Sequence, residues 1–166
     1  NPMPDRAVAD PLLTFTNRAA EELRQRVGFR CGAQAREVVV RTFHGLCAWM
    51  LRIEAKHIGL QSDFMIFDDA DSKEIIGRLM REREARYGAA WHGDKAAELY
   101  ADIDRAKAGA QDRVLSVGRV PDEVFAGLPP AARSIAIAYQ RELSLHHALD
   151  FGDLVYFVRA MFADRP

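Results

Sequence analysis

The sequence lacks most of the features that would place it in a catalytic, secreted or membrane class. Cys31 and Cys47 are its only cysteines, at no spacing typical of a metal or redox site. None of its glycines is followed by lysine, which excludes the G-x-x-x-x-G-K-[ST] loop that cradles nucleotide phosphates. No apolar run approaches membrane-spanning length, and the start, NPMPDRAVAD, has no signal-peptide pattern. We therefore expect a cytoplasmic chain that begins partway through a larger protein, with Cys47 as a buried reduced thiol.

The chain also lacks an excess of charge of either sign. It has 23 Lys and Arg against 24 Asp and Glu, so the whole chain has no polybasic signal for nucleic acid. The charges are nevertheless uneven, because residues 14–57 hold eight basic and four acidic side chains. A mildly basic lobe beside an acidic remainder is compatible with nucleic-acid binding without establishing it.

What the sequence does have near its start is two similar strand-to-helix corners. PLLTFTN is a short apolar run that stops at Thr16-Asn17, and the helix-forming RAAEELRQRVG that follows is expected to end at Gly28. EVVVRTFHG repeats the design, with a strand, Thr42 at the corner and then a helix. The apolar face of this second helix is predicted from helical spacing, and its members are Phe43, Leu46, Cys47, Met50 and Leu51.

From residue 68 onward the pattern is almost wholly helical. Helices are predicted in DDADSKEIIGRLMREREARYG, in DKAAELYADIDRAKAG up to Gly109, in AARSIAIAYQRELSLHH and in DFGDLVYFVRAMFAD. Between the second and third of these, Gly118, Pro121 and the pair Pro129-Pro130 favour loops and one short helix. The predicted fold is therefore mainly α: a helical bundle preceded by two short strands.

The two corners suggest an anion site, although a simpler interpretation exists. Free N–H groups at a helix N-terminus attract anions, and two corners on adjacent parallel strands would hold two phosphates side by side. Phe15, Phe43 and His44 would add stacking surfaces for bases, as single-strand binding requires. The alternative is that Thr16 and Thr42 are ordinary N-caps and the aromatic rings belong to the core, which the residue pattern alone favours.

Several segments, in order, resemble the UvrD/Rep/PcrA-type superfamily 1 DNA helicases. TFTNRAAEEL and TFHGLC look like motifs Ia and Ib of that family, and IFDDADSKEII looks like the start of the helical subdomain inserted in its first RecA-like domain. YADIDRAKAG resembles a helix of the same insert, and YQRELSLHHALDFGDLV resembles the segment that returns to the RecA-like core. The likeness covers about residues 12–163, and it shifts the interpretation of the corners from capping to DNA contact.

Carried over by motif, the resemblance implies contacts with single-stranded DNA along both corners. The implied residues are Phe15, Thr16, Asn17, Arg18, Thr42, Phe43 and His44. Thr hydroxyls and backbone N–H groups would hold phosphates, while the rings would meet bases. The chain departs from the family pattern at Arg18, where Lys is usual, at Gly45, where Ser is usual, and at Gly152, where an acidic residue or Ala is common.

Two other groups of residues resemble active sites on first inspection. FMIFDD at residues 64–69 is similar to a Walker B strand ending in magnesium-binding carboxylates, but Asp68 or Asp69 is better interpreted as the N-cap of the helix that follows. His146, His147, Asp150 and Asp153 would supply ligands for a metal hydrolase. Adjacent histidines on a helix diverge by about 100°, so we disfavour that site.

The resemblance implies that the chain is a fragment of an ATP-dependent DNA helicase with no ATP site of its own. Its expected parts are a RecA-like edge at 1–45, the helical insert at 46–149 and a helix at 150–166 that returns towards the core. ATP and Mg would bind elsewhere in the parent protein, and the expected partners are single-stranded DNA and the remaining motor domains. The alternative is a helical protein-interaction module without DNA function, which would use the acidic region 68–125.

Overall fold

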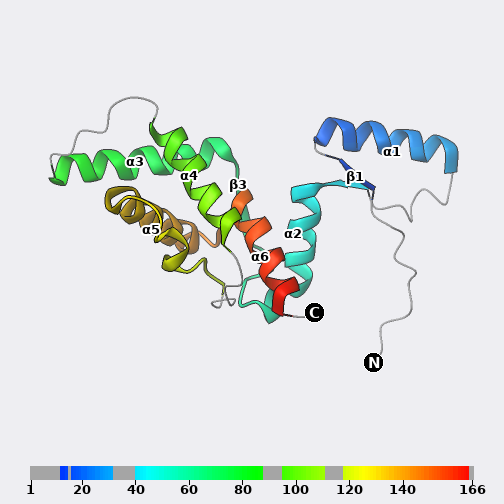
Figure 1. The fold of residues 1–166 in the computed structure, drawn as a ribbon. Helices are drawn as coiled ribbons and strands as arrows, with labels where there is room; N and C mark the ends of the chain where they lie inside the picture. The colour runs from blue at the N-terminus through cyan, green and yellow to red at the C-terminus, as the bar shows by residue number, and fades with distance from the viewer. Residues whose placement is uncertain (1–11, 15, 32–39, 88–94, 111–117, 165–166) are drawn as a thin grey trace. The chain divides into compact units, whose positions relative to one another are not determined.

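The computed structural model describes residues 12–14, 16–31, 40–87, 95–110 and 118–164. Within these ranges it has six α-helices and four strands of three residues each (Figure 1), which confirms the mainly α fold. The chain forms two compact units, Asn1–Trp49 and Met50–Pro166, divided within helix α2. No helix in the described ranges is long and apolar enough to cross a bilayer.

The first unit is a parallel pair of strands with a helix following each strand. Strands β1 (Leu12–Thr14) and β2 (Val40–Thr42) pair in parallel, with Thr14 opposite Thr42. Helix α1 (Asn17–Cys31) packs on the pair and buries Ala20. It continues past Gly28, so the predicted end at that glycine is wrong. Nothing crowds Gly28, and it adopts no positive φ, so it does not terminate the helix as a C-cap glycine does.

Helix α2 (Phe43–Glu54) begins directly after β2. Its buried residues include Cys47, Ala48 and Leu51, and Cys47 is a free thiol, as predicted. Burial raises the pKa of this thiol. Phe43 was expected on the same apolar face, but its side chain is 43% exposed, because the buried stripe starts one turn later.

The second unit is a helical bundle with a small sheet at one end. After a short 3₁₀ helix, η2 (Ala55–His57), come β3 (Met65–Phe67) and α3 (Asp69–Tyr87). They are followed by α4 (Lys95–Gly109), η3 (Asp122–Phe125), α5 (Pro130–Leu145), β4 (Ala148–Asp150) and α6 (Phe151–Asp164). Helix α3 packs against α4 and α5, and α4 packs against α6 (Figure 1).

The core of this bundle follows the predicted apolar spacing most closely in α5. The four residues predicted for its inner face, Ile135, Ala136, Tyr139 and Leu143, are all buried, and α4 ends at Gly109 as expected. In α6 the prediction is only partly confirmed. Leu154 is fully buried, but Phe162 at the far end of the expected stripe is 58% exposed.

The pairing of β3 with β4 was not predicted. The two strands are parallel, with Met65 opposite Ala148 and Phe67 opposite Asp150. The His147 carbonyl accepts a hydrogen bond from the Met65 N–H at 2.9 Å, and His147 has a φ of 48°. This left-handed residue follows His146, the C-cap of α5, and turns the chain into β4. Each strand is too short to show an alternating pattern in the sequence. It is recognised as a strand only by its pairing with a partner about 80 residues away along the chain.

Candidate nucleic-acid interface

The first corner joins β1 to α1 through Thr16. Its hydroxyl oxygen accepts a hydrogen bond from the Ala19 N–H at 3.1 Å, and its carbonyl accepts one from Ala20 N–H at 3.0 Å. This is the geometry of an N-cap residue. Thr16, Asn17 and Arg18 are all exposed, whereas Phe15 lies outside the described residues.

The second corner joins β2 to α2 in the same way. The hydroxyl oxygen of Thr42 accepts a hydrogen bond from the Gly45 N–H at 3.1 Å, so Thr42 is the N-cap of α2. A Cβ added at Gly45 would lie 2.9 Å from that hydroxyl oxygen, closer than side chains normally approach. The glycine at this position, where the family pattern has Ser, therefore leaves room for the cap as it stands.

Capping does not remove these threonines from consideration as anion ligands. A hydroxyl that accepts one hydrogen bond still has its own O–H to donate, and the capped helix keeps the positive end of its dipole. Thr14 and Thr42 are register partners in a parallel pair, so both helix N-termini lie at the same edge of the two strands. The structure thus brings the two predicted corners together.

Aromatic groups lie at the second corner. The rings of Phe43 and His44 meet edge to face, with centroids 5.8 Å apart and an interplanar angle of 73°. Phe43 is the more exposed of the two, and His44 is half-buried. The Phe43 ring is therefore an accessible apolar surface beside the N-terminus of α2.

Two cations border the corners, and sequence reasoning assigned a role to only one. Arg18 is 90% exposed at its side chain and pairs with Glu22 at 3.2 Å. Arg41 was counted only as part of the basic lobe, yet its guanidinium lies 5.4 Å from the centre of the Trp49 ring. The Arg41 Nε is buried and has no hydrogen-bond partner among the described residues. The signal available in the sequence was its position immediately before the Thr42 cap.

The second unit also has two strand-to-helix corners, but these are capped by acids. Asp68 Oδ1 accepts hydrogen bonds from the Ala70 and Asp71 N–H groups at 2.8 and 3.0 Å, and the Asp68 N–H donates to Asp71 Oδ2 at 3.1 Å. These backbone N–H groups lower the pKa of Asp68. The predicted N-cap at Asp68 is confirmed, and its carboxylate faces the helix it caps.

The other acidic corner contains the carboxylates that the metal-hydrolase alternative would need. Asp150 Oδ1 accepts a hydrogen bond from the Asp153 N–H at 2.7 Å, which makes Asp150 the N-cap of α6. The Lys107 Nζ lies 2.6 Å from Asp150 Oδ2 and 2.8 Å from Asp153 Oδ1. In the described ranges, no group of three or more His, Cys, Asp or Glu is arranged to hold a metal. Both acids thus neutralise a buried lysine.

Comparison with known proteins identifies the family. Residues 11–166 match the family model of the UvrD/REP helicase N-terminal domain. The chain is 30% identical over 161 residues to the ATP-dependent DNA helicase PcrA of Staphylococcus aureus, covering 93% of this chain and 20% of that protein. It is 27% identical over 157 residues to the ATP-dependent DNA helicase PcrA of Staphylococcus epidermidis, with the same coverage.

The chain therefore spans about a fifth of the length of the curated relatives it matches. The match to the family model covers both threonine-capped corners, the helical bundle and α6. The resemblance noted in the sequence motifs is confirmed: the chain belongs to the UvrD/REP helicase N-terminal domain family.

Proposed function

We propose that this chain is part of an ATP-dependent DNA helicase and supplies contacts to single-stranded DNA through its two threonine-capped corners. The observation that carries the proposal is the pair of α1 and α2 N-termini at one edge of a parallel strand pair. Two helix dipoles pointing to the same edge favour a ligand with regularly spaced negative charges, which a DNA backbone provides.

The identity of the caps distinguishes these corners from the other two in the molecule. Thr16 and Thr42 are neutral and leave the positive helix ends available to an anion. Asp68 and Asp150 place a carboxylate at the same point of α3 and α6, where it would repel a phosphate. The helix ends of the second unit are thus unsuited to anions, although all four corners share one topology.

The proposed contacts divide by chemistry. Hydroxyls of Thr16 and Thr42 and the free backbone N–H groups beside them would bind phosphates, and Asn17 and Arg18 would extend that contact. The rings of Phe15, Phe43 and His44 would stack on bases. Every base has a π-face that allows such stacking. Such contacts give little sequence preference, as suits a protein that moves along DNA.

In this proposal ATP and Mg bind in other parts of the parent protein. The capping of α3 by Asp68 supports this, because that carboxylate only resembles the end of a Walker B strand and is already bonded to helix N–H groups. We propose that the chain alone does not hydrolyse ATP and works with the remaining motor domains in the cytoplasm. The division into a RecA-like edge at 1–45, an insert at 46–149 and a returning helix at 150–166 stays a prediction.

The decisive experiment changes the charge of a corner without removing its cap. Thr42→Asp keeps an excellent N-cap but places a carboxylate where a phosphate should bind. We expect affinity for fluorescein-labelled oligo-dT, measured by anisotropy at low salt, to fall by about tenfold or more. The control is Thr42→Ser, which keeps the hydroxyl and should bind as the unchanged chain does.

The aromatic contacts need a separate variant. Replacing Phe15 and His44 together by alanine should weaken oligo-dT binding, because base stacking is worth about 1–3 kcal/mol per base. Equal binding by this double variant, by Thr42→Asp and by the unchanged chain would contradict the site. It would leave the protein-interaction module as the better description.

A further inference from the structure

Three ionisable side chains are buried together in the second unit. Lys107 on α4, Asp150 at the end of β4 and Asp153 in the first turn of α6 are each 1% exposed. The Lys107 Nζ contacts one oxygen of each carboxylate. Charges are buried in proteins only when partners compensate for lost hydration, so this cluster requires a specific arrangement.

Neutral groups from α5 complete the arrangement. The Tyr139 hydroxyl donates to Asp150 Oδ2 at 2.9 Å, and the Gln140 amide donates to Asp153 Oδ1 at 3.2 Å. The Asp150 N–H donates to Asp153 Oδ2 at 3.3 Å, in return for the bond from the Asp153 N–H. The cluster therefore ties α4, α5 and the beginning of α6 to one another.

The charges of the cluster do not balance. One ammonium faces two carboxylates, so the cluster carries a net charge of −1 when all three groups are ionised. Two carboxylates that share a buried site hold an additional proton more firmly than isolated ones do. The fold has thus enclosed a group of side chains with an unusual affinity for one proton.

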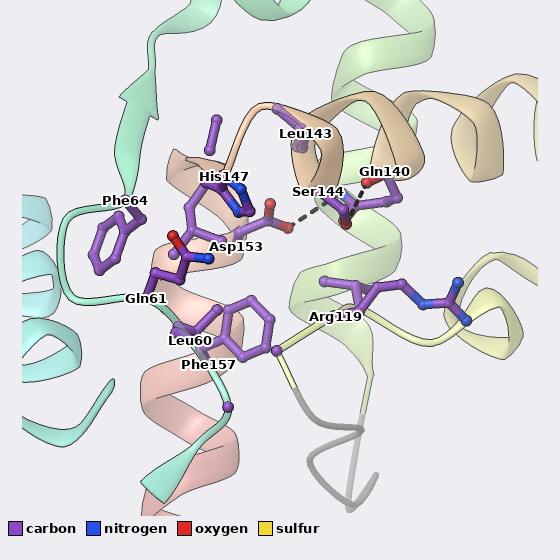
Figure 2. A pocket seen from close by; sticks show the side chains of 15 residues that line it. Leu60, Gln61, Phe64, Arg119, Gln140, Leu143, Ser144, His147, Asp153 and Phe157 are labelled. Carbon is purple, nitrogen blue, oxygen red and sulfur yellow. Dashed lines mark hydrogen bonds between the residues drawn. The ribbon is translucent and has the colours of Figure 1, made fainter. Parts of the chain in front are cut away.

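A cavity gives water a route to the cluster. It measures about 240 Å³, and Gln140 and Asp153 form part of its wall. Figure 2 shows the Asp153 carboxylate between the loop that carries Leu60 and Gln61 and the end of α5, with its hydrogen bond to Gln140 drawn. Asp153 is therefore the member of the cluster that a proton can reach from this cavity.

Helices α6 and α4 approach each other closely at Gly152, next to the cluster. A Cβ added at Gly152 would press on the Asp104 carboxylate and would lie 3.2 Å from Lys107 Cδ. This close approach of the two helices therefore includes the stem of Lys107, a member of the charged cluster.

We propose that Lys107, Asp150 and Asp153 form a proton-linked joint that holds α6 to α4 most firmly when Asp153 carries a proton and less firmly once that proton is lost. The joint is independent of the proposed DNA contacts, because all its residues lie in the second unit.

The direction of the pH dependence follows from the environment of Asp153. Burial, and then the charge of Asp150, raise the pKa of Asp153 to about 6, against the opposing effect of Lys107. The folded state therefore binds this proton more tightly than the unfolded state, whose Asp pKa is about 3.9. Stability from this group is fully present below about pH 4 and is lost as the pH rises through 6.

Lys107 acts in the same direction at higher pH. Burial opposes its charge, but the two carboxylates outweigh burial and raise the pKa of Lys107 above its usual value. Its contribution is present at neutral pH and is lost only at strongly alkaline pH. The window that identifies the joint is therefore pH 4–7, where Asp153 titrates.

Other charged or titratable groups near the cluster come from α4, α5 and the loops that line the cavity. Tyr100 and Asp104 lie on α4, Tyr139 lies on α5, and His147 and Arg119 line the cavity beside Asp153. Burial raises the pKa of both Tyr100 and Tyr139, so neither titrates between pH 4 and 7. A His147→Gln variant separates the contribution of this cavity-lining histidine from that of Asp153.

The test compares unfolding of the full chain in urea from pH 4.5 to 7.5. At each pH the unfolding constant of Asp153→Asn is divided by that of the unchanged chain. This ratio should fall by about tenfold or more as the pH rises from 4.5 to 7.5. Asp102→Asn is the control, since Asp102 lies on α4 in an exposed pair with Arg105, and its ratio should stay constant. A constant ratio for Asp153→Asn as well would overturn the joint.

A second measurement remains decisive if the variant does not fold. The ¹³Cγ resonance of Asp153 in the unchanged chain should titrate with a midpoint near 6, and the protection of the Asp153 amide against hydrogen exchange should fall above it. A midpoint at or below 4 would refute the proposal. The amide of Ala70 at the exposed Asp68 cap serves as the internal reference, with no such change expected.

Discussion

Lys107 is the residue with the largest expected effect on stability, since it is the only cation that contacts Asp150 and Asp153 in the described part of the chain. Lys107→Met fills a similar volume but leaves two carboxylates facing each other without an ammonium. Breaking a buried ion pair in this way typically costs about 3–5 kcal/mol. We expect that loss in urea unfolding at pH 7.

The matched control for Lys107 lies two residues earlier on the same helix. Arg105 pairs with Asp102 at 2.6 Å, but its side chain is 74% exposed. Arg105→Met should therefore change stability by no more than about 1 kcal/mol. Similar losses for both variants would mean that burial of the lysine has no energetic consequence.

Two glycines should respond in opposite directions to alanine. Gly152→Ala presses a methyl group on the Asp104 carboxylate and should destabilise the chain by about 1 kcal/mol, because crowding outweighs the gain in helix propensity. Gly28→Ala, inside α1 with nothing within 4 Å, should stabilise it by about 0.5–1 kcal/mol. Thermal unfolding followed by circular dichroism measures both, and a gain for Gly152→Ala would contradict the close approach.

At the scale of elements, the four strand-to-helix corners are the recurring unit. Each puts a capping side chain where a three-residue strand ends and a helix begins. Thr16, Thr42, Asp68 and Asp150 solve the same problem of unpaired N–H groups, but only the acids also neutralise the helix dipole. The choice of cap thus decides whether a corner can attract an anion.

Asp68 provides an element-scale prediction with a defined pH dependence. Its pKa is lowered, so its contribution is present above the unfolded-state pKa and is lost as the pH falls through the folded value. Asp68→Ala should lower the melting temperature at pH 7, and this difference should shrink in acid. Asp68→Ser retains a capping oxygen, so its melting temperature at pH 7 should lie between those of Asp68→Ala and the unchanged chain. A difference that does not change with pH would argue against the charged cap.

At the scale of the whole molecule, the proposed function predicts a modest salt dependence of DNA binding. Two corners that each neutralise one phosphate give a slope of log K against log salt of about −1.4 for single-stranded DNA. Titration of oligo-dT at several KCl concentrations measures it. A slope near zero would exclude contacts to the DNA backbone. A slope that is unchanged in Thr42→Asp would mean that the backbone contacts lie elsewhere on the chain.

Much of this molecule was accessible from local sequence. Helical spacing identified the buried face of α5, and the polar residue after each N-terminal strand identified both caps. These features depend on neighbours within about four residues. The motifs around Thr16 and Thr42 also indicated the family, which the comparisons confirm.

Other features were beyond local pattern because distant segments define them. The β3–β4 pairing joins residues far apart in the chain, and Lys107 reads in the sequence as an ordinary surface lysine of an amphipathic helix. Phe43 satisfied the helical spacing of a core residue yet remains exposed.

The sequence by itself thus determined the helices, the N-caps at Thr16, Thr42 and Asp68 and the family, because periodicity and capping act over a few residues. Tertiary structure decided that both threonine caps share one edge, since strand pairing aligns Thr14 with Thr42. It also decided that Lys107, Asp150 and Asp153 are buried as a cluster, because only packing of α4 against α6 removes them from water and makes their charges interdependent.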